Sequence, residues 1–196
     1  MDIEAFRIYS GPLVLKFKLD KKKLNEISKL CKKNSKKDFR KKLAGIIKHE
    51  YEINEKKYYK IIELYLKAYK HMYQEYHKVV IKKDIYCKSA WVNYMYSGEY
   101  NPPHIHNNCN FSSVLFLKIS NELKKERKHF VGTASKPGSL IFSFINPSAK
   151  HHISEYDTDT IEEGDFYIFP YNVHHSVNAF MSKGERITVA GNFDYE

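Results

Sequence analysis

The order of apolar and polar positions divides the chain into a helical first part and a strand-rich second part. Residues 12–19 alternate apolar and polar side chains and predict a strand. Apolar residues then recur every three or four positions in three segments, which predicts three helices. We expect these helices to begin after the capping residues Asp20, Ser35 and Asn54, and the third to span residues 55–80.

From residue 85 onward the pattern changes to short apolar segments that are separated by turns rich in Gly, Pro and Asn. These segments predict strands at residues 90–96, 103–106, 111–119, 128–134, 139–145, 150–155, 166–169, 174–179 and 186–194. Many short strands at this spacing are typical of a β-sandwich or barrel. We therefore expect one mainly β domain over residues 1–196, in which a helical part (1–89) packs on a β core (90–196).

The charge is distributed unevenly between these two parts. Residues 1–89 carry 24 Lys and Arg against 11 Asp and Glu, whereas residues 90–196 carry 9 against 12. Lysines interleaved with the tyrosines of the third predicted helix could suit single-stranded nucleic acid. Aromatic residues at helical spacing are more often a face packed on a sheet, and no recognition motif accompanies the charge. Nucleic-acid binding is therefore disfavoured.

The cysteines and the apolar runs bear on the compartment. Cys31, Cys87 and Cys109 are scattered and odd in number, so they indicate no disulfide framework. No run of about eighteen apolar residues predicts a membrane span, and the first residues lack the apolar core of a signal peptide. These features lead us to expect a cytoplasmic protein that does not contact a membrane.

Two histidines one residue apart are the first candidate for chemistry. In an extended chain, His104 and His106 point to the same side, and two imidazoles on one side begin a metal site. A third ligand must come from elsewhere. The pairs His151–His152 and His174–His175 each offer one inward ring. The second pair begins a late strand, which small barrels use to bring a histidine opposite an early pair.

The last predicted strand adds a candidate anion site. Arg186 begins this strand, and Thr188 shares its face by alternation. An arginine that points into a barrel needs an anion, and its planar guanidinium matches a carboxylate.

Five motifs, in this order, resemble those of a known family: WVNYMYSGEYNPPHIH, SSVLFLKIS, KPGSLIFSF, FPYNVHHSV and RITVAGNF. They resemble the Fe(II)/2-oxoglutarate-dependent oxygenases of marine bacteria and their phages, which are relatives of the prolyl 4-hydroxylases. The resemblance covers residues 90–196 and implies a double-stranded β-helix (jelly roll). It also implies an Fe(II) cofactor, 2-oxoglutarate as cosubstrate, and hydroxylation of a substrate with release of succinate and CO2.

The resemblance leaves the partners open. The substrate is a small molecule or a protein residue, with proline suggested only by kinship. The oligomeric state is also open, a homodimer included. The implied location is the cytoplasm of a bacterium or of a virus-infected host.

The family's functional residues carry over onto single positions of this chain. His104 matches the first histidine of the family's His-X-Asp/Glu motif, and His175 matches its distal histidine. Arg186 matches the basic residue that binds the distal carboxylate of 2-oxoglutarate, and Thr188 matches the hydroxyl beside it. Tyr94 stands where related enzymes place a cosubstrate-binding tyrosine.

His106 departs from the family pattern, because it stands where the usual site has a carboxylate. The resemblance then implies three histidine ligands, His104, His106 and His175. The alternative is that His106 lies behind the ligands and that water or a distant acid fills its position.

Two other interpretations remain. A cupin shares the fold and explains three histidines on one metal without 2-oxoglutarate, although the glutamate expected after His106 is absent and Arg186 has no role there. A metal-free β-sandwich could instead use the basic helices to dock an acidic partner.

Overall fold

A computed structural model describes residues 11–34, 37–145, 153–157 and 161–195. Its elements, in chain order, are β1 (Leu15–Lys18), α1 (Lys21–Asn34), the 3-10 helix η1 (Arg40–Lys42), β2 (His49–Glu52), α2 (Glu55–His77), β3 (Tyr86–Met95), β4 (Asn101–His104), β5 (Phe111–Ile119), α3 (Asn121–His129), β6 (Leu140–Ile145), β7 (Ile153–Asp157), β8 (Asp165–Pro170), β9 (His174–Val177) and β10 (Arg186–Asp194). In this part of the chain, no helix is both long and apolar enough to cross a bilayer.

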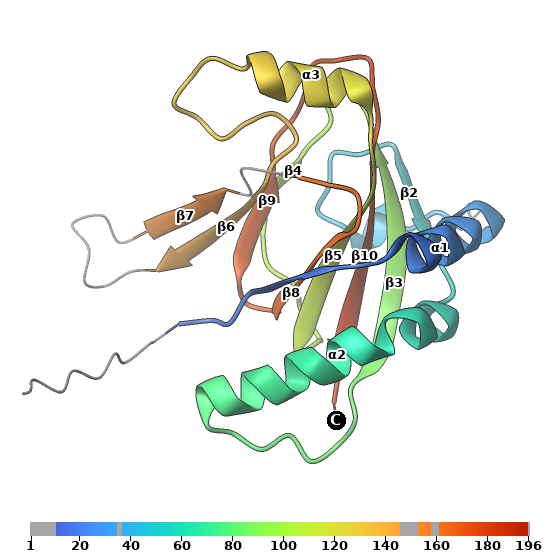
Figure 1. Ribbon diagram of the computed structural model, residues 1–196, viewed down its shortest axis with the longest axis vertical. Coiled ribbons are helices and arrows are strands. Elements are labelled where there is room, and N and C mark those ends of the chain that lie inside the picture. Colours follow the sequence, from blue (N-terminus) through green and yellow to red (C-terminus); the bar gives the residue numbers. More distant parts are fainter. Residues whose placement is uncertain (1–10, 35–36, 146–152, 158–160, 196) are drawn as a thin grey trace, which may run out of the picture.

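The strands form two antiparallel sheets that face each other (Figure 1). The larger has the order β1-β8-β5-β10-β3-β2, and the smaller has the order β4-β9-β6-β7. Helices α1 and α2 cover the outer face of the larger sheet (Figure 1). The predicted mainly β fold with N-terminal helices is therefore confirmed, and it is a double-stranded β-helix.

Two layers of apolar side chains hold these elements together. One lies between α1, α2 and the larger sheet, and the other lies between the two sheets, where Phe116, Phe142 and Phe169 are fully buried. Burying a Phe side chain contributes about 1.5–3 kcal/mol. The second layer fills one part of the space between the sheets and leaves another part free for a site.

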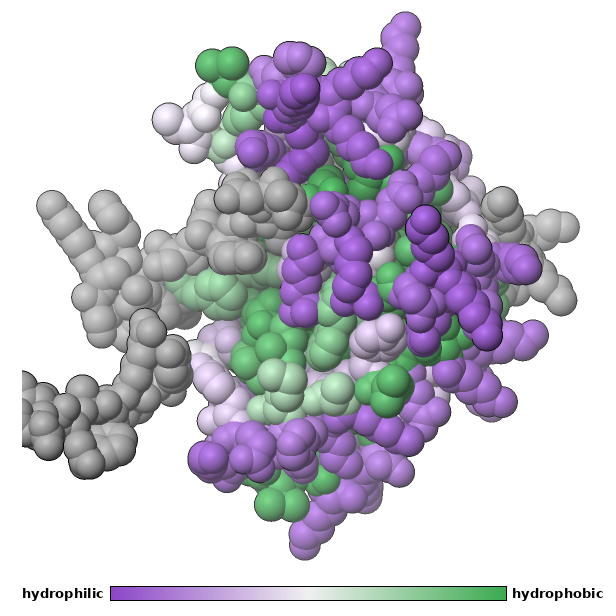
Figure 2. Space-filling model, in the orientation of Figure 1, coloured by the Kyte–Doolittle hydropathy of each residue, from purple (hydrophilic) through white to green (hydrophobic). Residues whose placement is uncertain are grey.

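The long helix α2 shows why its sequence is rich in tyrosine. Asn54 caps it, as predicted, because its side chain accepts a hydrogen bond from the Lys57 amide. Tyr58 and Tyr69 are fully buried against the sheet, together with Ile62. The aromatic stripe is thus a packing face. Hydrophilic residues gather over α1 and α3 on the solvent side (Figure 2).

Two predicted elements are wrong. The segment after Ser35 was expected to form a helix, but it forms only η1 and then the edge strand β2, which pairs with β3. The predicted strand 128–134 is absent, because α3 extends to His129 and residues 130–134 form neither helix nor strand. Ser120 caps α3 by accepting from the Leu123 amide. The segment before β2 did not become a helix, because pairing of β2 with the distant strand β3 outweighed its local apolar spacing. Helix α3 was not predicted, because Ser120 was not recognised as its cap. Part of the predicted strand 150–155 lies outside the described residues.

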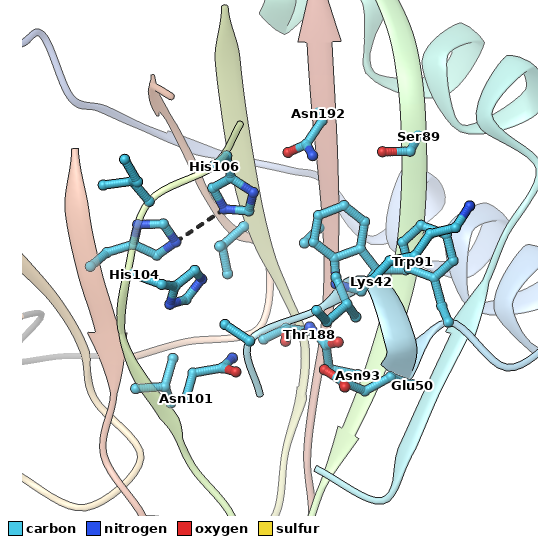
Figure 3. A pocket seen from close by; sticks show the side chains of 18 of the residues that line it. Lys42, Glu50, Ser89, Trp91, Asn93, Asn101, His104, His106, Thr188 and Asn192 are labelled. Atoms are coloured by element: carbon cyan, nitrogen blue, oxygen red, sulfur yellow. Dashed lines mark hydrogen bonds between the residues drawn. The ribbon is translucent and has the colours of Figure 1, made fainter. Parts of the chain in front are cut away.

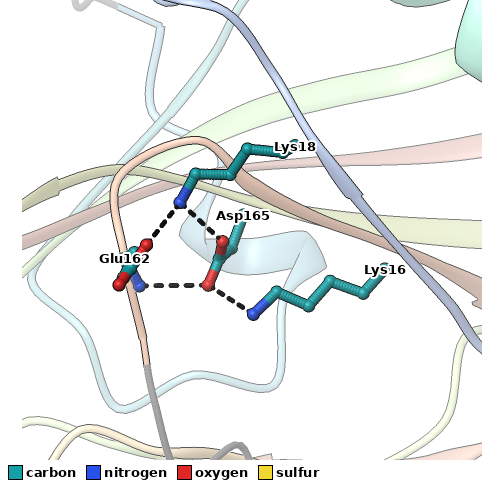
Figure 4. A network of polar contacts seen from close by, with 4 residues as sticks. All are labelled: Lys16, Lys18, Glu162 and Asp165. Carbon is teal, nitrogen blue, oxygen red and sulfur yellow. Dashed lines mark hydrogen bonds and ion pairs between the residues drawn. The ribbon is translucent and has the colours of Figure 1, made fainter.

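Ion pairs, as well as strand pairing with β8, hold strand β1 in place. Asp165 in β8 is 1% exposed and pairs with Lys16 at 2.8 Å and with Lys18 at 2.9 Å (Figure 4). Lys18 also reaches Glu162 at 2.8 Å. Because both lysines belong to β1, these contacts fix the N-terminal strand on the edge of the larger sheet.

Candidate active site

The three predicted histidines come together between the two sheets (Figure 3). His104 in β4 lies opposite His175 in β9 in the strand register, and His106 follows two residues after His104. Their ring nitrogens lie within 4.8 Å of one another, and Nε2 of His106 is 3.2 Å from Nε2 of His175. The antiparallel pairing of β4 with β9 therefore creates the cluster.

Backbone carbonyls set the orientation of two of these rings. Nδ1 of His104 lies 2.7 Å from the Pro102 carbonyl oxygen, and Nδ1 of His175 lies 2.9 Å from that of Val173. A carbonyl only accepts, so each Nδ1 carries the proton and each Nε2 presents a lone pair. Metal-binding histidines are typically held in this way.

The cluster favours the uncharged form of imidazole. Burial lowers the pKa of His104, His106 and His175, and the neighbouring rings lower those of His106 and His175 further. For His106 the pKa falls to about 3. Neutral imidazole is the form that binds metal. Three neutral imidazoles, each with a ligand nitrogen within 4.8 Å of the others, fit a divalent transition-metal ion.

The second group in the cavity is the side chain of Arg186, which requires an anionic partner. Arg186 is 2% exposed, and its guanidinium lies 4.6 Å from the centre of the Phe116 ring. Its Nη1 donates to Thr188 Oγ1 at 3.4 Å, but Nε and Nη2 have no partner among the described residues. Burial lowers the pKa of Arg186 to about 9, and the positive charge of Arg127 adds to this effect. A buried cation with free donors fits the carboxylate of a ligand.

Asn93 adds a donor that the sequence did not single out. It lies opposite Thr188 in the register of β3 and β10, and its Nδ2 is 3.4 Å from Thr188 Oγ1. It shares its strand face with Trp91, two residues earlier. Because side chains alternate along a strand, Asn93 could have been predicted to share the face of Trp91, the only Trp of the chain.

These groups line one cavity of about 550 Å³ (Figure 3). The histidines lie on the side of the smaller sheet, and Arg186, Thr188, Asn93 and Trp91 lie on the larger sheet. This volume is in the usual range of ligand pockets, about 300–1,000 Å³. A metal, a small dianion and part of a substrate can therefore share it.

Tyr94, which the sequence placed at the cosubstrate, lies outside this cavity. Its neighbour Asn93 faces the cavity, so alternation turns Tyr94 to the helical side of the sheet. There its ring lies 6.1 Å from the ring of Tyr51, and burial raises its pKa to about 12.

A buried carboxyl group also reaches the cavity. Glu50 in β2 is 1% exposed, and its Oε2 has no hydrogen-bond partner in the described part of the chain. Burial raises its pKa from 4.5 to about 7, and the charge of Glu99 adds to the shift. Glu50 could not be identified from the sequence, because the segment before it has the apolar spacing of a helix.

The raised pKa of Glu50 predicts a pH-dependent effect on stability. Between pH 4.5 and 7 the folded state holds a proton that the unfolded state releases, so this stabilising contribution is lost as the pH rises. We expect Glu50→Gln to match the wild type at pH 4.5 and to be more stable at pH 8, by up to about 3 kcal/mol.

Urea unfolding at the two pH values measures this difference. Glu52→Gln is the matched control, because Glu52 lies on the same strand, pairs with Lys37 and does not line the cavity. A Glu50→Gln variant that is less stable than the wild type at pH 8 would show that the carboxylate is stabilised by its surroundings.

Comparison with known proteins assigns the family. A family model described as "Putative 2OG-Fe(II) oxygenase" matches residues 89–192. No curated protein sequence gives a significant match. The match covers more than half of the chain, including the three histidines and Arg186, and it favours the oxygenase over the cupin and the metal-free module.

Solved structures show the same fold. An oxidoreductase of the 2OG-Fe(II) oxygenase family from Burkholderia pseudomallei is 13% identical, with 94% of this chain and 85% of that chain covered and a TM-score of 0.57. A prolyl 4-hydroxylase from Pseudomonas putida is 15% identical over 93% and 92%, with a TM-score of 0.53. A viral collagen prolyl hydroxylase from Paramecium bursaria Chlorella virus-1, in complex with 2-oxoglutarate, is 12% identical over 92% and 94%, with a TM-score of 0.59.

The family match, the three-histidine cluster and the buried arginine agree with one another. The cofactor is Fe(II), and the cosubstrate is 2-oxoglutarate. This chain belongs to the 2OG-Fe(II) oxygenases and is an enzyme of the 2-oxoglutarate-dependent class.

Proposed function

We propose that His104, His106 and His175 hold Fe(II) and that Arg186 and Thr188 bind the distal carboxylate of 2-oxoglutarate. The observation that carries this proposal is the buried guanidinium of Arg186, whose Nε and Nη2 lack partners within the described residues. It lines the same cavity as three imidazoles whose nitrogens lie within 4.8 Å of one another. One ligand with a carboxylate at one end and metal-binding oxygens at the other satisfies both groups.

The residues of this chain bind and orient in this scheme. The Nε2 atoms of His104 and His175 would be free to bind the metal, because their Nδ1 atoms donate to backbone carbonyls. Arg186 and Thr188 hold the far end of the cosubstrate, and Asn93 supplies a further amide beside Thr188. Trp91, 4% exposed, walls the cavity and keeps water away from the reacting groups.

The ligand set explains how the site tolerates a histidine in the place of a carboxylate. Three imidazoles bring no negative charge, so they would leave the full charge of a bound dication to be neutralised by an anion. A dianionic cosubstrate then supplies the neutralising charge that the protein does not. Bound Fe(II) supplies the redox chemistry with which dioxygen converts 2-oxoglutarate to succinate and CO2 and hydroxylates an aliphatic carbon.

The reaction we infer is the hydroxylation of an aliphatic C–H bond of a small molecule or a protein residue. Two of the structural neighbours are named as prolyl hydroxylases, so a prolyl peptide is one substrate to test. The identity to these proteins is only 15% and 12%, and it supports the shared fold alone.

An oxygen-triggered assay tests the function. The protein is loaded with Fe(II) and 2-oxoglutarate without oxygen, then mixed with oxygenated buffer, and succinate is measured. We expect succinate in amounts that equal the 2-oxoglutarate consumed, and none when Zn(II), which has no redox chemistry, replaces Fe(II). Iron binding without succinate formation, with or without candidate substrates, would contradict the proposal.

A further inference from the structure

Glu50 is a buried acid that the cavity leaves without a partner. Its Oε2 receives no hydrogen bond from the described residues, and none of their lysines or arginines forms an ion pair with it. Glu99, another buried acid nearby, differs, because its two oxygens accept from the amides of Lys48 at 3.0 Å and Tyr96 at 2.8 Å. Glu99 therefore has a structural role that Glu50 lacks.

The position of Glu50 separates it from the cosubstrate groups. In the strand register Glu50 lies opposite Asn93, and Asn93 lies opposite Thr188, so the three form a row across the larger sheet. Glu50 ends this row, on the other side of the cavity from His104 and His106 (Figure 3). A carboxylate repels a dianion, so we do not expect a dianion held by Arg186 and Thr188 to extend toward Glu50. Glu50 is therefore available for a different ligand.

Aromatic faces line the same end of the cavity. The rings of Trp91 and Phe39 stack at 5.6 Å with 27° between their planes, and Trp91 lies 6.0 Å from His106. Both line the cavity. The faces of aromatic rings attract cations, most strongly for Trp. Lys42 Nζ lies 5.1 Å from the centre of the Phe39 ring and also lines the cavity, so this aromatic wall already accepts one positively charged group.

The backbone passes close to the Glu50 carboxyl group at Gly45. A Cβ atom at Gly45 would lie 3.0 Å from Glu50 Oε1 and 2.4 Å from Asn101 Oδ1. Only a residue without a side chain lets the segment after η1 pass so close to Glu50 without moving these groups. The segment thus covers the acid and shields it from bulk water.

We propose that the substrate carries a positively charged nitrogen, an ammonium or a guanidinium group, that binds to Glu50. This inference rests on the proposed function, because it places the carbon to be oxidised between Glu50 and the histidines. A cationic N–H donor neutralises the buried carboxylate and satisfies its free oxygen in one contact. A free amine and a protein side chain offer the same chemistry, so the experiment must include both.

The fluorescence of Trp91 can report binding at this site, because Trp91 is the only Trp in the chain and lines the cavity. The protein is loaded with Zn(II) and 2-oxoglutarate, and its fluorescence is followed during titration. The cationic probes are n-pentylamine and N-acetyl-lysine methylamide, and the neutral match of the latter is N-acetyl-norleucine methylamide. We expect the lysine probe to bind at least about tenfold more tightly than the norleucine probe.

The Glu50→Gln variant removes the charge and keeps the shape of the side chain. It should lose the preference for the lysine probe, whereas Glu52→Gln, on the same strand and outside the cavity, should keep it. Tight binding of n-pentylamine alone would indicate a free amine, and binding of the lysine probe alone a protein side chain. Both results support a cationic substrate.

Other results overturn the inference. Equal binding of the lysine and norleucine probes contradicts it, and so does a preference that survives in Glu50→Gln. Tighter binding of a prolyl peptide than of either cationic probe, with no dependence on Glu50, contradicts it as well. Calorimetric binding of Zn(II) and 2-oxoglutarate is measured beforehand, and its failure would count against the proposed function instead.

Discussion

The His175→Ala variant is expected to lose Fe(II) binding. His175 is 3% exposed, and its Nε2 lies 3.2 Å from that of His106, so its removal leaves two donors for the metal. Loss of a hydrogen-bonding group behind a metal ligand typically lowers affinity by about 10–100-fold, and loss of the ligand itself should exceed this. Anaerobic equilibrium dialysis with Fe(II) measures the effect.

The neighbouring residue supplies a matched control. His174 precedes His175 on β9, but its side chain is exposed and points away from the cluster. His174→Ala should keep the wild-type affinity for Fe(II). His175→Gln, which preserves more of the side-chain volume, separates loss of the ligand from loss of packing. Fe(II) binding that is unchanged in both His175 variants would remove this residue from the metal site.

The second large effect is expected from Arg186→Met, which should lower the affinity for 2-oxoglutarate by at least about 100-fold. Truncating one partner of a buried, hydrogen-bonded charge pair typically costs about 2–5 kcal/mol. The variant should not destabilise the protein in the absence of ligands, because Nε and Nη2 have no partners to lose among the described residues. Replacing a buried charge with an apolar side chain is often neutral or stabilising.

Two measurements together make this prediction specific. Calorimetry of 2-oxoglutarate binding gives the affinity, and urea unfolding without ligands gives the stability. Lys118→Met is the control for charge, because Lys118 is on the neighbouring strand and pairs with Glu185 at the surface. A large loss of stability with unchanged affinity for 2-oxoglutarate would mean that Arg186 supports the fold and does not bind the cosubstrate.

The metal cluster could be predicted from the sequence because its signals are local. His104 and His106 are related by alternation within one segment, and Arg186 and Thr188 by alternation within another. The resemblance then linked the distant His175 to them. The structure brings all five residues to the same cavity.

Glu50 and Tyr94 show what could not be predicted from the sequence. Glu50 reaches the cavity only because β2 pairs with β3, and this contact between distant segments leaves no periodic signal in a strand of four residues. Tyr94 was assigned by its place along the chain in related enzymes, but the pleat of β3 places it on the opposite face from Asn93. A spacing along the chain fixes a distance, whereas the face depends on the register of the strand.

The most direct test of the central claim is the binding of 2-oxoglutarate to the protein with and without Fe(II), measured anaerobically by calorimetry. We expect one Fe(II) and one 2-oxoglutarate per chain. The affinity for 2-oxoglutarate should be at least about tenfold higher with Fe(II), because three neutral imidazoles leave the charge of the metal for the cosubstrate to neutralise. Equal affinity with and without Fe(II), or no binding of 2-oxoglutarate at all, would contradict the account.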